Sequence, residues 1–176
     1  MRFGIVGAGF SGAVIGRELA ERVAGELNTM LEKLEGVEPP FIVVGHSMGG
    51  SVIAEAARLM PDRVIGLIGV DTFENIEYPM TQEEYTKMFA PLEADFSSGS
   101  RKFIEEMMLP GTDPQLREWI LADISAAPKA IALSASREMM SQYITGEAAR
   151  IFEEIKVPVI TVKGDLWPVD YDANRR

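Results

Sequence analysis

Phe41-Ile42-Val43-Val44-Gly45-His46-Ser47-Met48-Gly49-Gly50 is the stretch of sequence that decides the fold of this chain. Its first four residues are apolar and rich in β-branched side chains, which predicts a buried strand. In residues 51–60 the apolar positions recur at spacings of three and four, which predicts a helix. Between the strand and the helix, residues 45–49 match the pattern G-x-S-x-G. A serine on such a sharp turn stands clear of the sheet, at a helix N-terminus whose free N–H groups favour developing negative charge.

Ser47 has two interpretations on this evidence. It is either a nucleophile on a strand–turn–helix elbow or an ordinary serine in a glycine-rich turn. Residues 37–63 resemble the α/β-hydrolase superfamily, and a less specific resemblance extends over roughly residues 22–176. The resemblance implies that Ser47 is the nucleophile, that the Met48 N–H is one oxyanion donor, and that the substrate is a small apolar ester or similar acyl compound.

The overall composition is that of an ordinary globular domain. The 176 residues are 47% hydrophobic and 25% charged, which favours one α/β domain with a substantial core. The net charge of −10 argues against a nucleic-acid or anionic-membrane surface, and the sequence has no apolar run long enough for a membrane span. Because the chain has no cysteine, it can form neither disulfides nor thiolate metal sites. Its single histidine disfavours a histidine-based metal site. We expect a cytoplasmic protein.

The N-terminal segment carries a second glycine motif. Residues 2–6 predict a strand, Gly7, Gly9 and Gly12 complete G-x-G-x-x-G, and residues 13–34 have the apolar stripe of a helix. Residues 1–21 resemble the start of FAD-binding enzymes such as the UDP-galactopyranose mutases, which implies a bound FAD or NAD. However, the next strand ends near Val44 and lacks the acidic residue that holds the ribose in such sites. No cofactor is therefore the main expectation, with a dinucleotide module as the alternative.

The same glycine loop has two further interpretations. In the hydrolases that the chain resembles, a glycine-rich loop beside the nucleophile strand supplies the other oxyanion donor. If residues 2–6 pair with residues 41–44, the N–H of Phe10 or of a neighbouring residue serves as this second oxyanion donor. Alternatively, the loop only turns the chain.

The rest of the chain predicts two more strands separated by a helical insertion. Residues 64–70 and 157–162 are the strands. Helices are expected at 82–89, 100–108, 114–124, 129–143 and 146–155, and we assign residues 76–155 to a helical cap within the single α/β domain. Six methionines of this insertion either line a pliable pocket or pack between helices.

Two carboxylates are candidates for the acid that accompanies Ser47. Asp165 follows the last strand, where the acid commonly lies in the family that the chain resembles, and Asp71 follows the preceding strand. Either one could instead be a turn or helix cap. The histidine of a Ser–acid–His triad is missing, because His46, the only histidine, precedes Ser47 on the same turn and points away from its face. We therefore expect the chain to be an impaired or inactive hydrolase, or a non-catalytic interaction fragment.

The expected sheet has a consequence for association. Four parallel strands in the order 1-2-3-4, joined by right-handed crossovers, place their helices on one face. Residues 41–44 and 157–162 are nevertheless apolar on both faces, as strands covered on both sides are. An exposed apolar face of this size favours association, and we predict that the chain can form a homodimer.

Overall fold

The computed structural model describes residues 3–6, 29, 39–164 and 172. Its centre is a four-stranded parallel sheet in the order β1-β2-β3-β4, as the sequence predicts. The strands are β1 (Phe3–Val6), β2 (Phe41–His46), β3 (Val64–Val70) and β4 (Val159–Val162). The β2 strand extends two residues further than expected, and β4 is two residues shorter than expected. The order of the strands and their parallel direction agree with the expectation. All four carboxyl ends therefore meet at one edge of the sheet.

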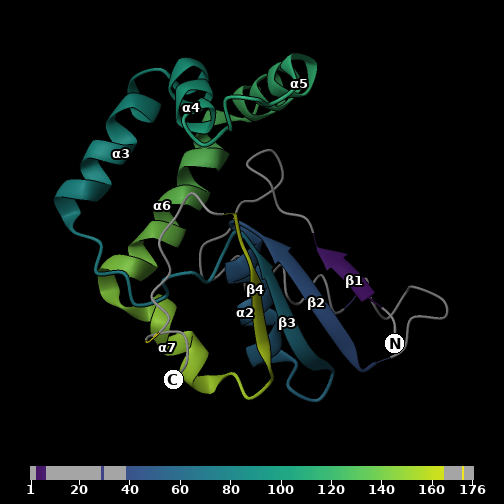
Figure 1. Ribbon diagram of the computed structural model, residues 1–176. Helices are drawn as coiled ribbons and strands as arrows, with labels where there is room; N and C mark the ends of the chain where they lie inside the picture. The colour runs from purple at the N-terminus through teal and green to yellow at the C-terminus, as the bar shows by residue number, and fades with distance from the viewer. Residues whose placement is uncertain (1–2, 7–28, 30–38, 165–171, 173–176) are drawn as a thin grey trace.

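One face of the sheet carries the main core. Phe41, Val43 and Leu67 point to that face and are almost fully buried against helix α2 (Gly49–Leu59). Helix α7 (Glu147–Glu154) packs on α2, and its Ile151 and Phe152 contact the same core (Figure 1). The α7 helix therefore packs with the sheet layer, although it lies within the segment that the sequence assigns to a cap.

The other face is more exposed at β4. Ile160 and Val162 point away from the face that α2 covers, and their exposed fractions are 56% and 53%. Among the described residues, β4 pairs on one side only, with β3. The expected open apolar face is thus present at this strand, and the homodimer stays a prediction.

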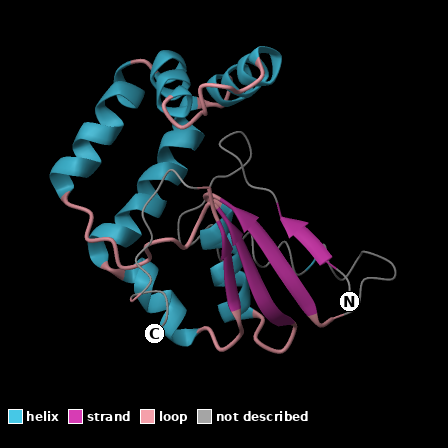
Figure 2. Ribbon diagram, viewed as in Figure 1, coloured by secondary structure: helices cyan, strands magenta, loops and turns pink. Residues whose placement is uncertain are grey.

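Four helices lie beyond the carboxyl ends of the strands or lead toward them (Figures 1 and 2). They are α3 (Gln82–Ala94), α4 (Phe96–Glu105), α5 (Pro114–Ser125) and α6 (Lys129–Thr145). They have a separate core of six buried residues: Phe89, Leu92, Phe96, Ala127, Ala132 and Leu133. None of the described helices is long and apolar enough to cross a membrane.

The ends of these helices follow from local chemistry. Thr81 and Glu84 form the capping box that the sequence predicts for α3. The α3 helix continues beyond the expected end at Phe89 and through Pro91, because Phe89 and Leu92 both point into the second core. The α4 helix begins four residues earlier than expected, since the Asp95 side chain accepts a hydrogen bond from the Ser98 N–H.

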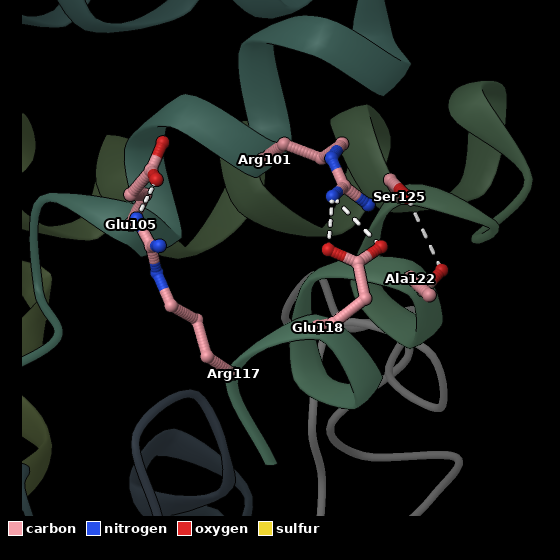
Figure 3. A network of polar contacts seen from close by, with 6 residues as sticks. All are labelled: Arg101, Glu105, Arg117, Glu118, Ala122 and Ser125. Carbon is pink, nitrogen blue, oxygen red and sulfur yellow. Dashed lines mark hydrogen bonds and ion pairs between the residues drawn. The ribbon is translucent and has the colours of Figure 1, made fainter. Parts of the chain in front are cut away.

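Ion pairs join α4 to α5 on the surface of this helical layer (Figure 3). The Arg101 guanidinium donates to both carboxylate oxygens of Glu118, at 2.9 and 2.8 Å. Arg117 pairs with one carboxylate oxygen of Glu105 across the same two helices. These side chains are largely exposed, so each pair contributes less than about 1 kcal/mol to stability.

Candidate active site

Ser47 occupies a strained turn between β2 and α2. Its φ is 50°, in the left-handed region that L residues rarely adopt, and its side chain is exposed. The turn is held from both sides: the Ser47 N–H donates to the Val70 carbonyl at 2.9 Å, and the Ser47 carbonyl accepts from the Gly50 N–H at 2.9 Å. The predicted strand, sharp turn and helix are therefore all present, with Ser47 at the apex.

Two glycines make this turn possible for steric reasons. A Cβ added to Gly45 would lie 2.4 Å from the Gly49 carbonyl oxygen, closer than any real contact. A Cβ added to Gly50 would lie 2.2 Å from Thr72 Oγ1, in the loop that follows β3. The turn is thus packed against itself and against the neighbouring loop, which fixes the position of Ser47.

Met48 lies directly after the apex. Its side chain is buried, with 4% of its surface exposed, and its backbone angles are helical. Within the described part of the chain, no acceptor is bonded to its N–H, which lies at the start of α2. An N–H in this place is suited to bind a developing oxyanion.

The loop after β3 is strained as well. Asp71 and Phe73 have φ values of 45° and 70°, and the Phe73 ring lies 2.5 Å from where a Cβ on Gly69 would be. Phe73 meets the ring of Phe152 on α7 edge-on, with centroids 4.9 Å apart. This packing holds the loop against the sheet core and leaves Asp71 at the exposed carboxyl edge.

The Asp71 carboxylate joins the ends of β3 and β4. Its Oδ1 accepts a hydrogen bond from the Gly164 N–H at 2.9 Å, and the Asp71 N–H donates to the Val162 carbonyl at 2.8 Å. The sequence indicates Asp71 as a candidate acid, but the hydrogen bond to Gly164 spans 93 positions and has no local signal.

His46 does not complete a triad with these residues. It is the last residue of β2, where the alternation of side chains places it on the face opposite Val43 and α2. It is exposed, and within the described part of the chain its imidazole ring makes no hydrogen bond. The expectation that His46 points away from the site agrees with this position.

Several other predicted site residues lie outside the described residues. They are Gly7, Gly9, Phe10, Gly12 and Asp165. The pairing of β1 with β2, on which the proposed oxyanion role of Phe10 depends, is present. Among the described residues, no cluster of three or more metal-ligating side chains is found.

A small cavity lies next to the turn, beside α2. It has a volume of about 20 Å³, and Ser51, Thr72 and Tyr143 are among the residues that line it. Burial, and next the nearby carboxylate of Glu74, raise the pKa of Tyr143 above its ordinary value. A space of this size suits about one water molecule, so this cavity is not a substrate pocket.

Comparison with known protein families shows which family the chain belongs to. The model of the alpha/beta hydrolase family matches residues 7–172, which is nearly the whole chain. The chain belongs to the alpha/beta hydrolase family. Among curated proteins, no sequence matches it.

Solved structures of this hydrolase fold resemble the chain at low sequence identity. AqDC, described as binding the Pseudomonas quinolone signal and cleaving its ring, has a TM-score of 0.65 and 21% identity over 92% of this chain and 60% of its own. A carboxylesterase of Nitrososphaera gargenis has a TM-score of 0.58 and 16% identity, over 89% of this chain and 56% of its own. An esterase of Thermogutta terrifontis has a TM-score of 0.55 and 22% identity, over 86% of this chain and 65% of its own.

These identities establish the fold and not an activity. The chain spans less than two thirds of the length of these relatives. The activities of the relatives therefore do not transfer to this chain directly.

Proposed function

We propose that this chain is a serine ester or acyl hydrolase in which Ser47 accepts an acyl group, and in which turnover is slow. The observation that carries the proposal is the left-handed φ of 50° at Ser47, on an exposed turn between β2 and α2. Backbone strain of this kind costs about 1–3 kcal/mol and is found mainly at functional sites. An ordinary serine in a βα turn has no need of it.

The slow turnover that we propose follows from the lack of a histidine base for Ser47. Acyl transfer requires a group that takes the proton of the serine hydroxyl as the C–O bond forms. The chain has one histidine, and His46 lies on the opposite face of β2. Sites that lose a triad member keep about 10³–10⁴-fold of rate enhancement from binding and oxyanion donors. We therefore expect Ser47 to react with activated acyl compounds and to turn over poorly.

The substrate that we propose is a small, apolar ester-like compound. The helical layer of α3 to α6 lies beyond the strand ends where Ser47 is found (Figure 1). Partly buried Tyr85, Met88 and Met140 pack at the core of this layer and would give an apolar, adaptable surface. Acetyl and butyryl esters of p-nitrophenol are suitable probes of this preference.

Labelling with a fluorophosphonate tests the assignment of Ser47. We expect slow incorporation of one phosphonyl group per chain, detected by intact-protein mass spectrometry, and none in Ser47→Ala. Ser51→Ala is the matched control, because Ser51 lies four residues further on in α2 and should not affect labelling. Equal labelling of the wild type and Ser47→Ala, or no labelling of either, would contradict the assignment.

A further inference from the structure

The β4 strand is an outer strand of the sheet, and its backbone shows which side faces outward. In the part of the chain that the structure describes, β4 pairs only with β3. The Pro158 and Val162 carbonyls accept hydrogen bonds from β3 and the loop after it, and the Gly164 N–H donates to the same loop. Successive residues of a strand direct their N–H and C=O groups to alternate sides. The groups of Val159 and Thr161 therefore point away from β3.

The outward side of β4 lacks the devices that usually protect an edge strand. Such strands are protected by prolines, charged side chains or bulges. Pro158 precedes β4, and its carbonyl faces β3, so the N–H that a proline lacks is missing on the β3 side. The four residues of β4 are uncharged, and their register with β3 is regular. Since the side chains of Ile160 and Val162 are also more than half exposed, another strand can reach this edge.

The charge around β4 differs in sign from that of the whole chain. Residues 155–164 contain two lysines, Lys156 and Lys163, and no acidic residue, whereas the net charge of the chain is −10. The net negative charge of one copy therefore attracts this segment of another copy. A contact through β4 is thus electrostatically better for two copies than a contact through their acidic faces.

From these observations we propose that β4 pairs with β4 of a second copy of this chain, antiparallel and about a two-fold axis at Ile160. The two sheets then form one continuous sheet. Val159 of each copy pairs with Thr161 of the other copy, and the two residues exchange both backbone hydrogen bonds. Ile160 lies opposite Ile160 of the second copy, at a position where opposing Cα atoms are about 4.5 Å apart and the side chains are in contact.

The register of this pair follows from the backbone. Val159 and Thr161 are the residues of β4 whose N–H and C=O groups can bond to another copy. A two-fold axis between Ile160 and Thr161 would place each of them opposite a residue that faces β3, and no hydrogen bonds would form. An axis at Ile160 pairs them correctly and covers Ile160, the most exposed side chain of the strand. It also places Lys163 opposite Val157 of the second copy, so that no like charges are opposed.

The other outer strand of the described sheet, β1, fits a second copy less well. Pairing β4 with β1 of another copy is a heterologous contact, which leaves one β1 and one β4 without a partner and continues into a chain of molecules. The pair of β4 strands is isologous and closes at two copies. One contact then pairs both β4 edges.

Single cysteine variants test the register, because the chain has no cysteine of its own. In Ile160→Cys the two thiols meet across the axis, within the Cα separation of about 4.4–6.8 Å that a disulfide spans. We expect a covalent dimer after mild oxidation, measured on a non-reducing gel. Val162→Cys is the matched control, since Val162 is similarly exposed on the same face. Its two thiols would be about 13 Å apart along the strands, so it should not cross-link.

Sedimentation equilibrium between about 1 µM and about 500 µM measures the association itself. Because β4 is short, we expect a weak, reversible dimer, with the average mass of the wild type rising from 19.3 kDa toward twice that mass. Ile160→Lys places like charges opposite each other and should raise the Kd about tenfold or more. Its melting temperature should change little, because the side chain is exposed. Ile131→Lys, at an exposed position of α6, is the control and should dimerise as the wild type.

Several outcomes would contradict the proposal. A wild type that remains a monomer over the whole concentration range would overturn it, and so would equal effects of Ile160→Lys and Ile131→Lys. Equal cross-linking of Ile160→Cys and Val162→Cys would mean that the copies meet only by collision. Species that grow beyond a dimer with concentration would indicate pairing of β4 with β1 and would contradict the closed pair.

Discussion

Gly45→Ala is expected to destabilise the chain by about 2–3 kcal/mol, in the upper part of the range of about 1–3 kcal/mol that is typical when an extra methyl group is forced into packed structure. The added Cβ would lie 2.4 Å from the Gly49 carbonyl oxygen and 2.7 Å from its carbon. Both atoms are backbone, so the clash can be relieved only by moving β2 away from α2. Urea unfolding followed by circular dichroism measures the change in the free energy of unfolding.

Gly111→Ala is the matched control for Gly45→Ala. Its added Cβ meets nothing within 4 Å, so its free energy of unfolding should change by less than about 0.5 kcal/mol. Similar destabilisation of the two variants would mean that the turn is not closely packed. Because the same clash displaces Ser47, Gly45→Ala should also lose fluorophosphonate labelling under conditions in which it remains folded.

The second large effect is expected from Arg58→Met, which removes the partner of a buried carboxylate. Glu55 lies in α2 with 3% of its surface exposed, and Arg58 Nε donates to its Oε2 at 2.9 Å. Arg58 also lies 3.7 Å from Glu154 and so joins α2 to α7. Removing one member of a buried pair costs about 3–5 kcal/mol, because the remaining charge is left without a partner. Since the Arg58 side chain is itself one fifth exposed, we expect the free energy of unfolding to fall by about 3 kcal/mol, the lower end of this range.

Two variants control for this interpretation. Arg101→Met breaks the exposed pair with Glu118 and should cost less than about 1 kcal/mol. The double variant Glu55→Leu with Arg58→Met should be more stable than Arg58→Met alone, because no buried charge remains. If the double variant is the less stable of the two, the buried carboxylate is not the cause of the loss.

Local patterns were enough to predict the elements around the site. The apolar run at residues 41–44 and the periodic helix pattern after Ser51 predict β2 and α2, and the capping box at Thr81 predicts the start of α3. The parallel order of the four strands also agrees with the structure. These features depend on neighbouring residues or on the handedness of crossovers, which a single sequence contains.

Features that depend on distant contacts could not be predicted in this way. Pro91 favours a helix end locally, yet α3 continues because Phe89 and Leu92 are buried against α6 and its neighbours. The position of α7 on α2 depends on the packing of Phe152 against Phe73. The Asp71 carboxylate is held by a hydrogen bond from Gly164, 93 residues away, for which the sequence holds no signal.

The most direct test of the function of Ser47 is the time course of p-nitrophenolate release from p-nitrophenyl acetate. We infer that Ser47 is placed to accept an acyl group and that no residue of the chain serves as its base. We predict slow release of at most one equivalent per chain, followed by a steady rate at least about a thousandfold below the ~10 s⁻¹ that is typical of enzymes. Ser47→Ala should show no such release. Sustained turnover near the typical rate that Ser47→Ala abolishes would contradict the account, because a base must then be present.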